Sequence, residues 1–169
     1  LAPDVLERAA AGRGVADPQQ ARTLARLASG DLLELERLLA GEDEGGRREH
    51  FDLFCSLMRL SYNDKHLELI GWAEEAAQLP REQQRGFLVD AARLLRESYM
   101  LHAGLGRIGY LWGAELAFCS KFAPYVGSEN IEPLVAEIES AMAQISQNGN
   151  PTIVFTHFAL SVSKMIKRM

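Results

Sequence analysis

The chain has 169 residues, of which 47% are hydrophobic and 24% are charged, a composition that is ordinary for globular proteins and too apolar for a disordered chain. Its formal net charge of -5 disfavours a dedicated nucleic-acid binder, which normally carries a basic excess. No apolar run reaches the roughly 20 residues that span a bilayer, and the amino terminus lacks a signal-peptide pattern. We therefore expect a cytoplasmic protein that does not bind membranes.

Three short helices are predicted in the first part of the chain. Pro3-Asp4 opens a run to about Gly12, Asp17-Pro18 opens a second run to Ser29-Gly30, and Asp31 caps a third that ends at Gly41. The segment from Gly41 to Gly46 combines glycines with three acidic residues and contains no apolar residue, which is typical of a surface linker. We place a domain boundary there, between residues 1–44 and residues 45–169.

The second part of the chain carries the apolar spacing of roughly six helices. They are predicted at about residues 51–60, 62–79, 80–102, 114–125, 128–147 and 151–167, with Pro80 as the first residue of the third. Asn148-Gly149-Asn150-Pro151 is interpreted as a stop and restart between the last two. Alternation with a period of two is not sustained anywhere, so no sheet is predicted and the fold class is all-α.

One glycine-rich segment matches a nucleotide-binding pattern. Gly104-Leu-Gly106-Arg-Ile-Gly109 has the spacing GxGxxG of dinucleotide-binding proteins. That chemistry needs a strand before the glycines and a helix after them, so that the helix amino terminus meets the pyrophosphate. Here a long predicted helix precedes the segment, so we interpret it as a loop between helices and predict no cofactor.

Neither a metal site nor a catalytic nucleophile is predicted. A di-metal site in a helical bundle needs a Glu three residues before a His on two helices, and none of the four histidines has one. Cys55 and Cys119 each stand alone in an apolar run, without the paired spacing of a zinc or redox site. The chain also lacks a GxSxG elbow. We therefore predict no catalytic or metal-binding residue and two buried, reduced thiols.

Arginines are concentrated along the helix predicted at residues 80–102. They are Arg81, Arg85, Arg93 and Arg96. Three acidic residues, Glu82, Asp90 and Glu97, alternate with them. Because these acids largely cancel the field that phosphate contacts require, we prefer a solvated, salt-bridged helix face to a DNA-binding stripe.

An apolar stripe along the last predicted helix provides the candidate interface. Phe155, Phe158 and Val162 share one face of that helix, and Met165 extends it. Such stripes usually belong to a core. Interfaces are also enriched in aromatic residues and methionine, so we expect part of this stripe to contact a partner.

Several segments carry a resemblance to a known family. The segment Leu27-Ala-Ser-Gly-Asp-Leu-Leu-Glu-Leu-Glu-Arg-Leu-Leu39 resembles the helical lid of clamp-loader AAA-plus ATPases. Residues 60–75, 122–125 and 148–155 are similar to the collar of the delta-prime subunits of bacterial DNA polymerase III. The resemblance covers nearly the whole chain. It implies a three-helix lid over residues 1–44, a helical collar over residues 45–169 and an ATPase-like core domain upstream.

The resemblance also implies a role. Leu33 stands where the nucleotide-sensing arginine of the lid usually lies, and it can neither pair with a phosphate nor carry a charge. The implied role is therefore a non-catalytic subunit without a cofactor. Its implied partners are the motor gamma/tau and delta subunits, with indirect contact to the sliding clamp and primed DNA. Two alternatives stay open: a helical-repeat adaptor that binds peptides in a groove, and an enzyme with convergent polar groups in a pocket.

Overall fold

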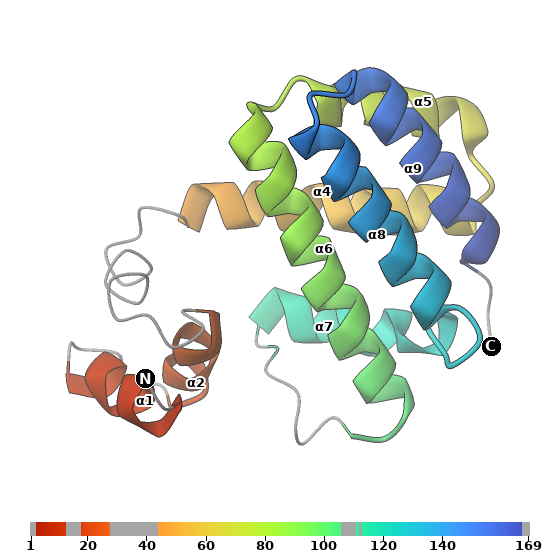
Figure 1. Cartoon of the computed structure of the whole chain (residues 1–169). Coiled ribbons are helices and arrows are strands. Elements are labelled where there is room, and N and C mark those ends of the chain that lie inside the picture. Colours follow the sequence, from red (N-terminus) through yellow and green to blue (C-terminus); the bar gives the residue numbers. More distant parts are fainter. Residues whose placement is uncertain (1–2, 13–17, 28–43, 106–110, 112, 167–169) are drawn as a thin grey trace.

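The computed structural model describes residues 3–12, 18–27, 44–105, 111 and 113–166 (Figure 1). All secondary structure in these residues is helical, without a strand, which confirms the predicted all-α class. Of the helices in this part of the chain, none is both long enough and apolar enough to cross a membrane. The third predicted helix, Asp31 to Gly41, and Leu33 lie outside the described residues.

Two helices near the amino terminus form a small hydrophobic cluster of their own. They are α1 (Pro3–Gly12) and α2 (Pro18–Leu27). Each begins with a proline, which cannot donate a hydrogen bond and is favoured in a first helical turn. The cluster consists of Leu6, Ala10, Ala21, Leu24 and Ala25. Both helices are thus confirmed where the sequence predicts them.

The larger part of the chain forms six α-helices within the described residues, in agreement with the predicted number. They are α4 (Glu44–Tyr62), α5 (His66–Ala77), α6 (Arg81–His102), α7 (Gly113–Phe122), α8 (Ile131–Ser146) and α9 (Pro151–Met165), and a short 3-10 turn, η1 (Ala123–Tyr125), follows α7. The predicted linker is wrong in its second half, because α4 already begins at Glu44.

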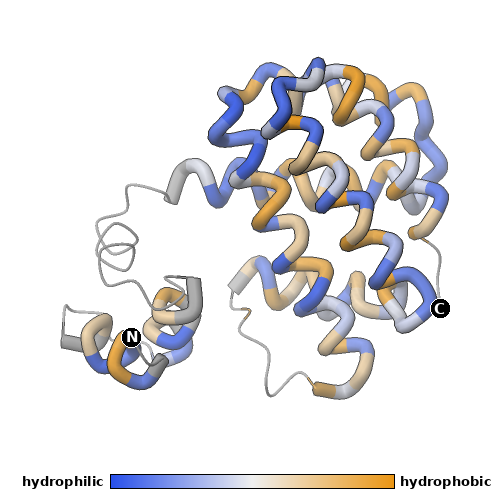
Figure 2. The backbone as a smooth tube through the Cα atoms, in the orientation of Figure 1, coloured by the Kyte–Doolittle hydropathy of each residue, from blue (hydrophilic) through white to orange (hydrophobic). Residues whose placement is uncertain are grey.

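Four helices of the bundle pack side by side in the order α5, α9, α8 and α6 (Figure 1). Helix α4 packs across α5, α9 and α6, and helix α7 packs against α6. Hydrophobic residues alternate with hydrophilic ones along these helices (Figure 2), as expected when one face of each helix is buried. At the centre, the rings of Trp72, Phe87, Phe155 and Phe158 lie with their contacting centroids 5.7 to 6.4 Å apart. The indole nitrogen of Trp72 donates to the carbonyl oxygen of Leu53 at 2.9 Å, so this buried polar group is satisfied.

The stop and restart between α8 and α9 is confirmed. Asn148 adopts a left-handed conformation with a φ of 60°, and the backbone nitrogen of Gly149 donates to the carbonyl oxygen of Gln144 at 2.8 Å, which closes α8. Asn150 then caps α9, because its side-chain oxygen accepts from the backbone nitrogen of Ile153 at 3.2 Å. These local bonds explain why a four-residue motif was sufficient to predict the turn.

The start of α6 differs by one residue from the prediction. Pro80 precedes the helix, and Arg81 is its first residue. The guanidinium of Arg81 donates to the carbonyl oxygens of Ile145 and Gly149, at 3.0 and 3.3 Å. The carbonyl of Ile145 lies in the last turn of α8, where the helix dipole favours a cation, and that of Gly149 lies in the turn that follows. Arg81 therefore ties the start of α6 to the end of α8.

Candidate functional site

Three of the four predicted interface residues lie in the core of the bundle. The exposed fractions of Phe155, Phe158 and Val162 are 0%, 1% and 0%. Met165 is half-buried and packs against the same core, and its carbonyl oxygen accepts from the side chain of Asn130 at 3.0 Å. A side chain without exposed surface cannot contact a partner unless the fold opens. The predicted interface is therefore corrected: Phe155, Phe158 and Val162 hold α9 inside its own bundle.

The four arginines of α6 are divided between the interior and the surface. Arg81 binds the carbonyl oxygens at the end of α8. Arg93 donates to both carboxylate oxygens of Glu115 on α7, at 3.0 and 2.8 Å. Arg85 and Arg96 are exposed, and neither forms an ion pair within the described residues. Two of the four charges are thus used inside the fold, and the four do not form a continuous basic stripe.

A partly buried polar network joins α4, α6 and α7. The ring nitrogens of His50 lie 2.7 Å from Asp90 Oδ2 and 2.9 Å from Gln83 Oε1. Arg93 Nε lies 3.8 Å from Asp90 Oδ1, so the network continues to Glu115. Burial of the Arg93 guanidinium lowers its pKa, but the hydrogen bonds and charge of Glu115, together with Asp90, outweigh this effect and hold the pKa above its ordinary value. The Arg93 guanidinium is therefore charged at neutral pH, and it binds Glu115 through two hydrogen bonds.

The pair of His50 and Asp90 has two of the three parts of a catalytic triad. A nucleophile would have to lie within hydrogen-bond distance of the second ring nitrogen of His50, and Gln83 occupies that place at 2.9 Å. The ring is also buried, with a residue exposure of 5%. The geometry therefore supports a structural role, in which the network fixes how α4 crosses α6.

The two cysteines are buried, which confirms that prediction. Burial raises the pKa of Cys55 from 9.0 to about 12 and that of Cys119 from 9.0 to about 11. Both are therefore protonated thiols at neutral pH, and a protonated thiol is a poor nucleophile. Across the described ranges, no group of three or more His, Cys, Asp or Glu side chains is placed to hold a metal ion.

We expect the buried thiols to make the folded state less stable as pH rises above about 9. Cys55 and Cys119 ionise near pH 9.0 when unfolded and only near pH 11 to 12 when folded, so the unfolded state loses its protons first and gains relative stability through this range. Urea denaturation at increasing pH measures the effect, and a variant with both cysteines replaced by alanine should lose less stability over the same range. Rapid alkylation of either thiol in the native protein near neutral pH would contradict the assignment.

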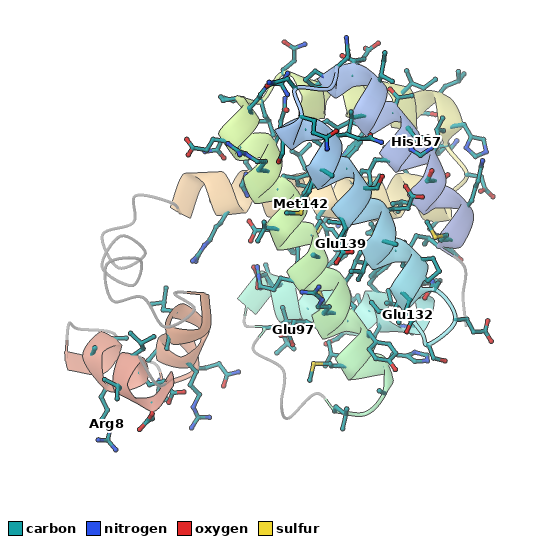
Figure 3. All side chains as sticks on the ribbon, in the orientation of Figure 1. Arg8, Glu97, Glu132, Glu139, Met142 and His157 are labelled. Carbon is teal, nitrogen blue, oxygen red and sulfur yellow. The ribbon has the colours of Figure 1, made fainter. Side chains whose placement is uncertain are left out.

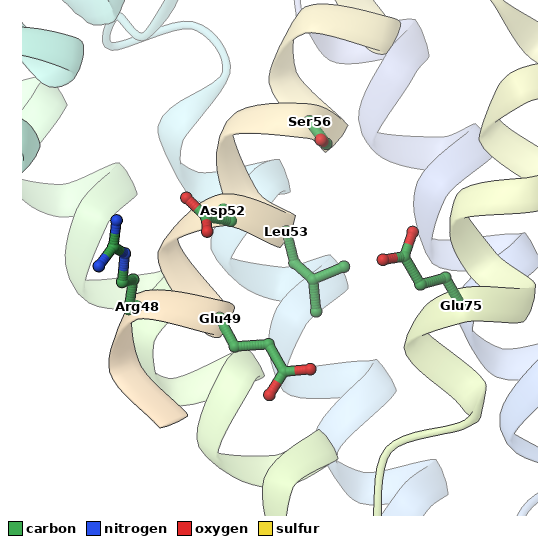
Figure 4. Close-up of a pocket in the computed structure, with 6 residues that line it drawn as sticks. All are labelled: Arg48, Glu49, Asp52, Leu53, Ser56 and Glu75. Carbon is green, nitrogen blue, oxygen red and sulfur yellow. The ribbon is translucent and has the colours of Figure 1, made fainter. Parts of the chain in front are cut away.

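A shallow groove of about 350 Å³ lies between α4 and α5 (Figure 4). Its lining residues are Arg48, Glu49, Asp52, Leu53, Ser56 and Glu75. Ligand pockets are usually lined mainly by apolar side chains, whereas this groove offers one buried leucine among charged and polar groups. We assign it no ligand. Its three carboxylates do, however, make the surface beside α5 acidic.

A helix enters the glycine-rich segment at its amino-terminal end, as the sequence predicts. The helix α6 runs to His102 and Gly104 has a φ of 77°, a left-handed conformation that suits glycine at a helix end. A helix therefore enters the segment where dinucleotide binding needs a strand. Gly106 and Gly109 lie outside the described residues.

Two mid-helix glycines provide a matched test of packing. An added Cβ at Gly86 in α6 would lie 2.9 Å from Cε1 of His50, whose ring is held by two hydrogen bonds, so we expect Gly86→Ala to destabilise the fold by about 1–2 kcal/mol. An added Cβ at Gly71 in α5 meets nothing within 4 Å, so we expect Gly71→Ala to stabilise the fold by about 0.5–1 kcal/mol. Thermal unfolding of both variants measures the two effects, and a Gly86→Ala variant as stable as the unchanged protein or more stable would show that the His50 ring moves aside.

Polar side chains such as Glu139 and His157 stand on the outer surface of α8 and α9 (Figure 3). A few large apolar side chains are also exposed on the surface of the chain. In the α4–α9 bundle they are Leu67, Ile153, Val89, Tyr62, Leu105, Leu116 and Ile70, with exposed fractions from 82% down to 40%. Single exposed apolar residues are ordinary, whereas those that share a helix face suggest an interaction surface.

Comparison with known proteins identifies no relative of this chain. No family model matches the chain, and neither a curated protein nor a solved structure matches it.

Proposed function

We propose that this chain is a non-catalytic assembly subunit of a bacterial clamp loader, of the delta-prime kind, with a lid over residues 1–44 and a collar over residues 45–169. In this role the collar binds the motor and delta subunits in the cytoplasm, and the complex loads the sliding clamp onto primed DNA. One observation carries the proposal: within the described residues there are two separate hydrophobic cores, a small one in α1 and α2 and a large one in α4 to α9. A small lid followed by a helical collar needs such a division.

The use of the reactive groups favours assembly over catalysis. The His50 imidazole is enclosed between Asp90 and Gln83, and the Arg93 guanidinium is paired with Glu115. Both thiols are buried with raised pKa values. In most enzymes such groups converge on an open pocket, whereas here, among the described residues, they stabilise contacts between helices.

The packing order of the helices favours a bundle over the helical-repeat adaptor. In a repeat protein each helix pair contacts mainly its neighbours in sequence. Here α9 packs against α5 and α4 as well as against α8, so the carboxyl-terminal helix closes onto the first helices of the bundle. This closed arrangement supports the collar proposal.

The test is light scattering after size exclusion on the full-length protein that contains this chain, alone and mixed with the motor and delta subunits of the same organism. We expect a stable complex of pentameric mass that is lost when residues 45–169 are removed. Circular dichroism of the shortened protein checks that its remaining domains stay folded. If the intact protein does not elute with these subunits, the clamp-loader proposal is wrong and the adaptor becomes the better explanation.

A further inference from the structure

One face of α5 is apolar at its centre and exposed. Leu67, Ile70, Gly71 and Glu74 follow the spacing i, i+3, i+4, i+7, which places them on the same side of the helix. Leu67 is 82% exposed and Ile70 is 40% exposed, although α5 already buries its opposite side, which includes Trp72. We call these four residues the α5 face.

In the part of the chain that the structure describes, no neighbouring side chain requires a glycine at position 71. A Cβ at Gly71 would meet nothing within 4 Å, and glycine weakens a helix interior relative to alanine. Glycine does allow a second helix to approach closely from outside. The carboxylates of Glu68, Glu74 and Glu75 surround the position, and none of them forms an ion pair within the described residues. The α5 face is therefore an apolar surface with an acidic rim.

A face of complementary charge lies on α6. Arg85, Val89, Ala92 and Arg96 share one side of that helix, and we call them the α6 face. Val89 is 54% exposed, and the two arginines on either side of it have no ion pair within the described part of the chain. Glu82, one turn before Arg85, is the acidic residue at the edge of this face.

The two faces belong to the outer helices of one row. Because α9 and α8 separate α5 from α6, each of the outer helices has a side turned away from the bundle (Figure 1). The small residues Gly71 and Ala92 match the close axial spacing of packed helices, roughly 8–10 Å. The acidic rim of one face also matches the arginines of the other.

We propose that the α5 face of one copy of this chain binds the α6 face of a second copy, in a head-to-tail manner. Leu67 and Ile70 pack on Val89 and Ala92, while Glu74 and Glu75 lie toward Arg85 and Arg96. Each copy keeps one face free, so the contact is heterologous and extends into open chains or closes into a ring. This inference does not depend on the identity of the partners in the clamp-loader proposal.

Analytical ultracentrifugation of the 169-residue chain tests this pairing, over a range from about 10 μM to about 1 mM. We expect the average mass to rise with concentration beyond that of a dimer and to fall when salt is added, because the rim is ionic. Leu67→Glu and Val89→Glu should each abolish association. An equimolar mixture of the two variants should form a one-to-one dimer that does not grow, since each variant retains the face that the other has lost.

Ile153→Glu is the matched control. Ile153 is an exposed apolar residue on α9, 69% exposed, and it lies on the side of α9 that faces α8, because His157 one turn later is 3.9 Å from Glu137 of α8. This variant should associate like the unchanged chain. A monomer at every concentration overturns the proposal. So does association that survives both substitutions, or a mixture of the two variants that stays monomeric. If the chain does not self-associate, the clamp-loader proposal is still tested separately, by light scattering with the motor and delta subunits.

Discussion

Phe155→Ala is expected to lower the free energy of unfolding by about 3–5 kcal/mol. The ring is 0% exposed and contacts three other aromatic rings, with centroids 6.1 to 6.4 Å away. Without the ring, the fold loses the free energy gained by transferring a phenyl group from water to the protein interior. A cavity remains, which the surrounding helices fill only in part. Urea denaturation followed by circular dichroism measures the loss.

Ile153→Ala is the control for this prediction. Ile153 lies two residues before Phe155 on the same helix, is 69% exposed, and should change the unfolding free energy by no more than about 0.5 kcal/mol. The comparison also separates a core residue from an interface residue. If Phe155→Ala weakened association and left the stability of the monomer unchanged, the ring would be an interface group after all.

Arg93→Met is expected to lower the free energy of unfolding by about 2–4 kcal/mol. Methionine preserves much of the length and volume of the side chain, but it leaves the carboxylates of Glu115 and Asp90 without their shared cation. The side chains of Arg93 and Glu115 are 22% and 21% exposed, so water compensates only part of the loss. The double variant Arg93→Met, Glu115→Gln should recover a substantial part of the stability, because it removes the uncompensated charge.

Arg85→Met is the matched control on the same helix. Arg85 is exposed and has no ion pair within the described residues, so the stability of the monomer should stay within about 0.5 kcal/mol of the unchanged protein. Effects of Arg93→Met and Glu115→Gln that simply add would show that the two side chains do not interact in solution.

Much of the helical organisation was predictable because its signals are local. The turn from Asn148 to Pro151 uses bonds between residues at most five positions apart, and each residue type suits its backbone conformation. The end of α6 near His102 was predictable for the same reason, since a glycine comes shortly after it. The start of α4 at Glu44 was not, because glycine and acidic residues suit a linker as well as a first helical turn, and the neighbouring residues decide between the two.

The polar network and the exposed faces were not predictable from local patterns. His50 and Asp90 lie 40 positions apart, and Arg93 and Glu115 lie 22 apart. Inspection of each histidine by itself has no means of finding such pairs. The same holds for Leu67 and Ile70, which fit an apolar helical pattern as well as Leu69 does but lie on the opposite side of α5.

The sequence by itself determined the all-α class, the ends of most helices and the burial of both thiols, because these depend on propensity, capping and hydrophobic periodicity over a few turns. Only the tertiary structure decided which apolar stripes are core and which face solvent. The physical reason is that an apolar stripe gains free energy by leaving water whether its own chain or a partner covers it. Phe155 and Leu67 differ because α9 is enclosed by α4, α5 and α8, whereas the outer side of α5 is left exposed at Leu67 by the part of the chain that the structure describes.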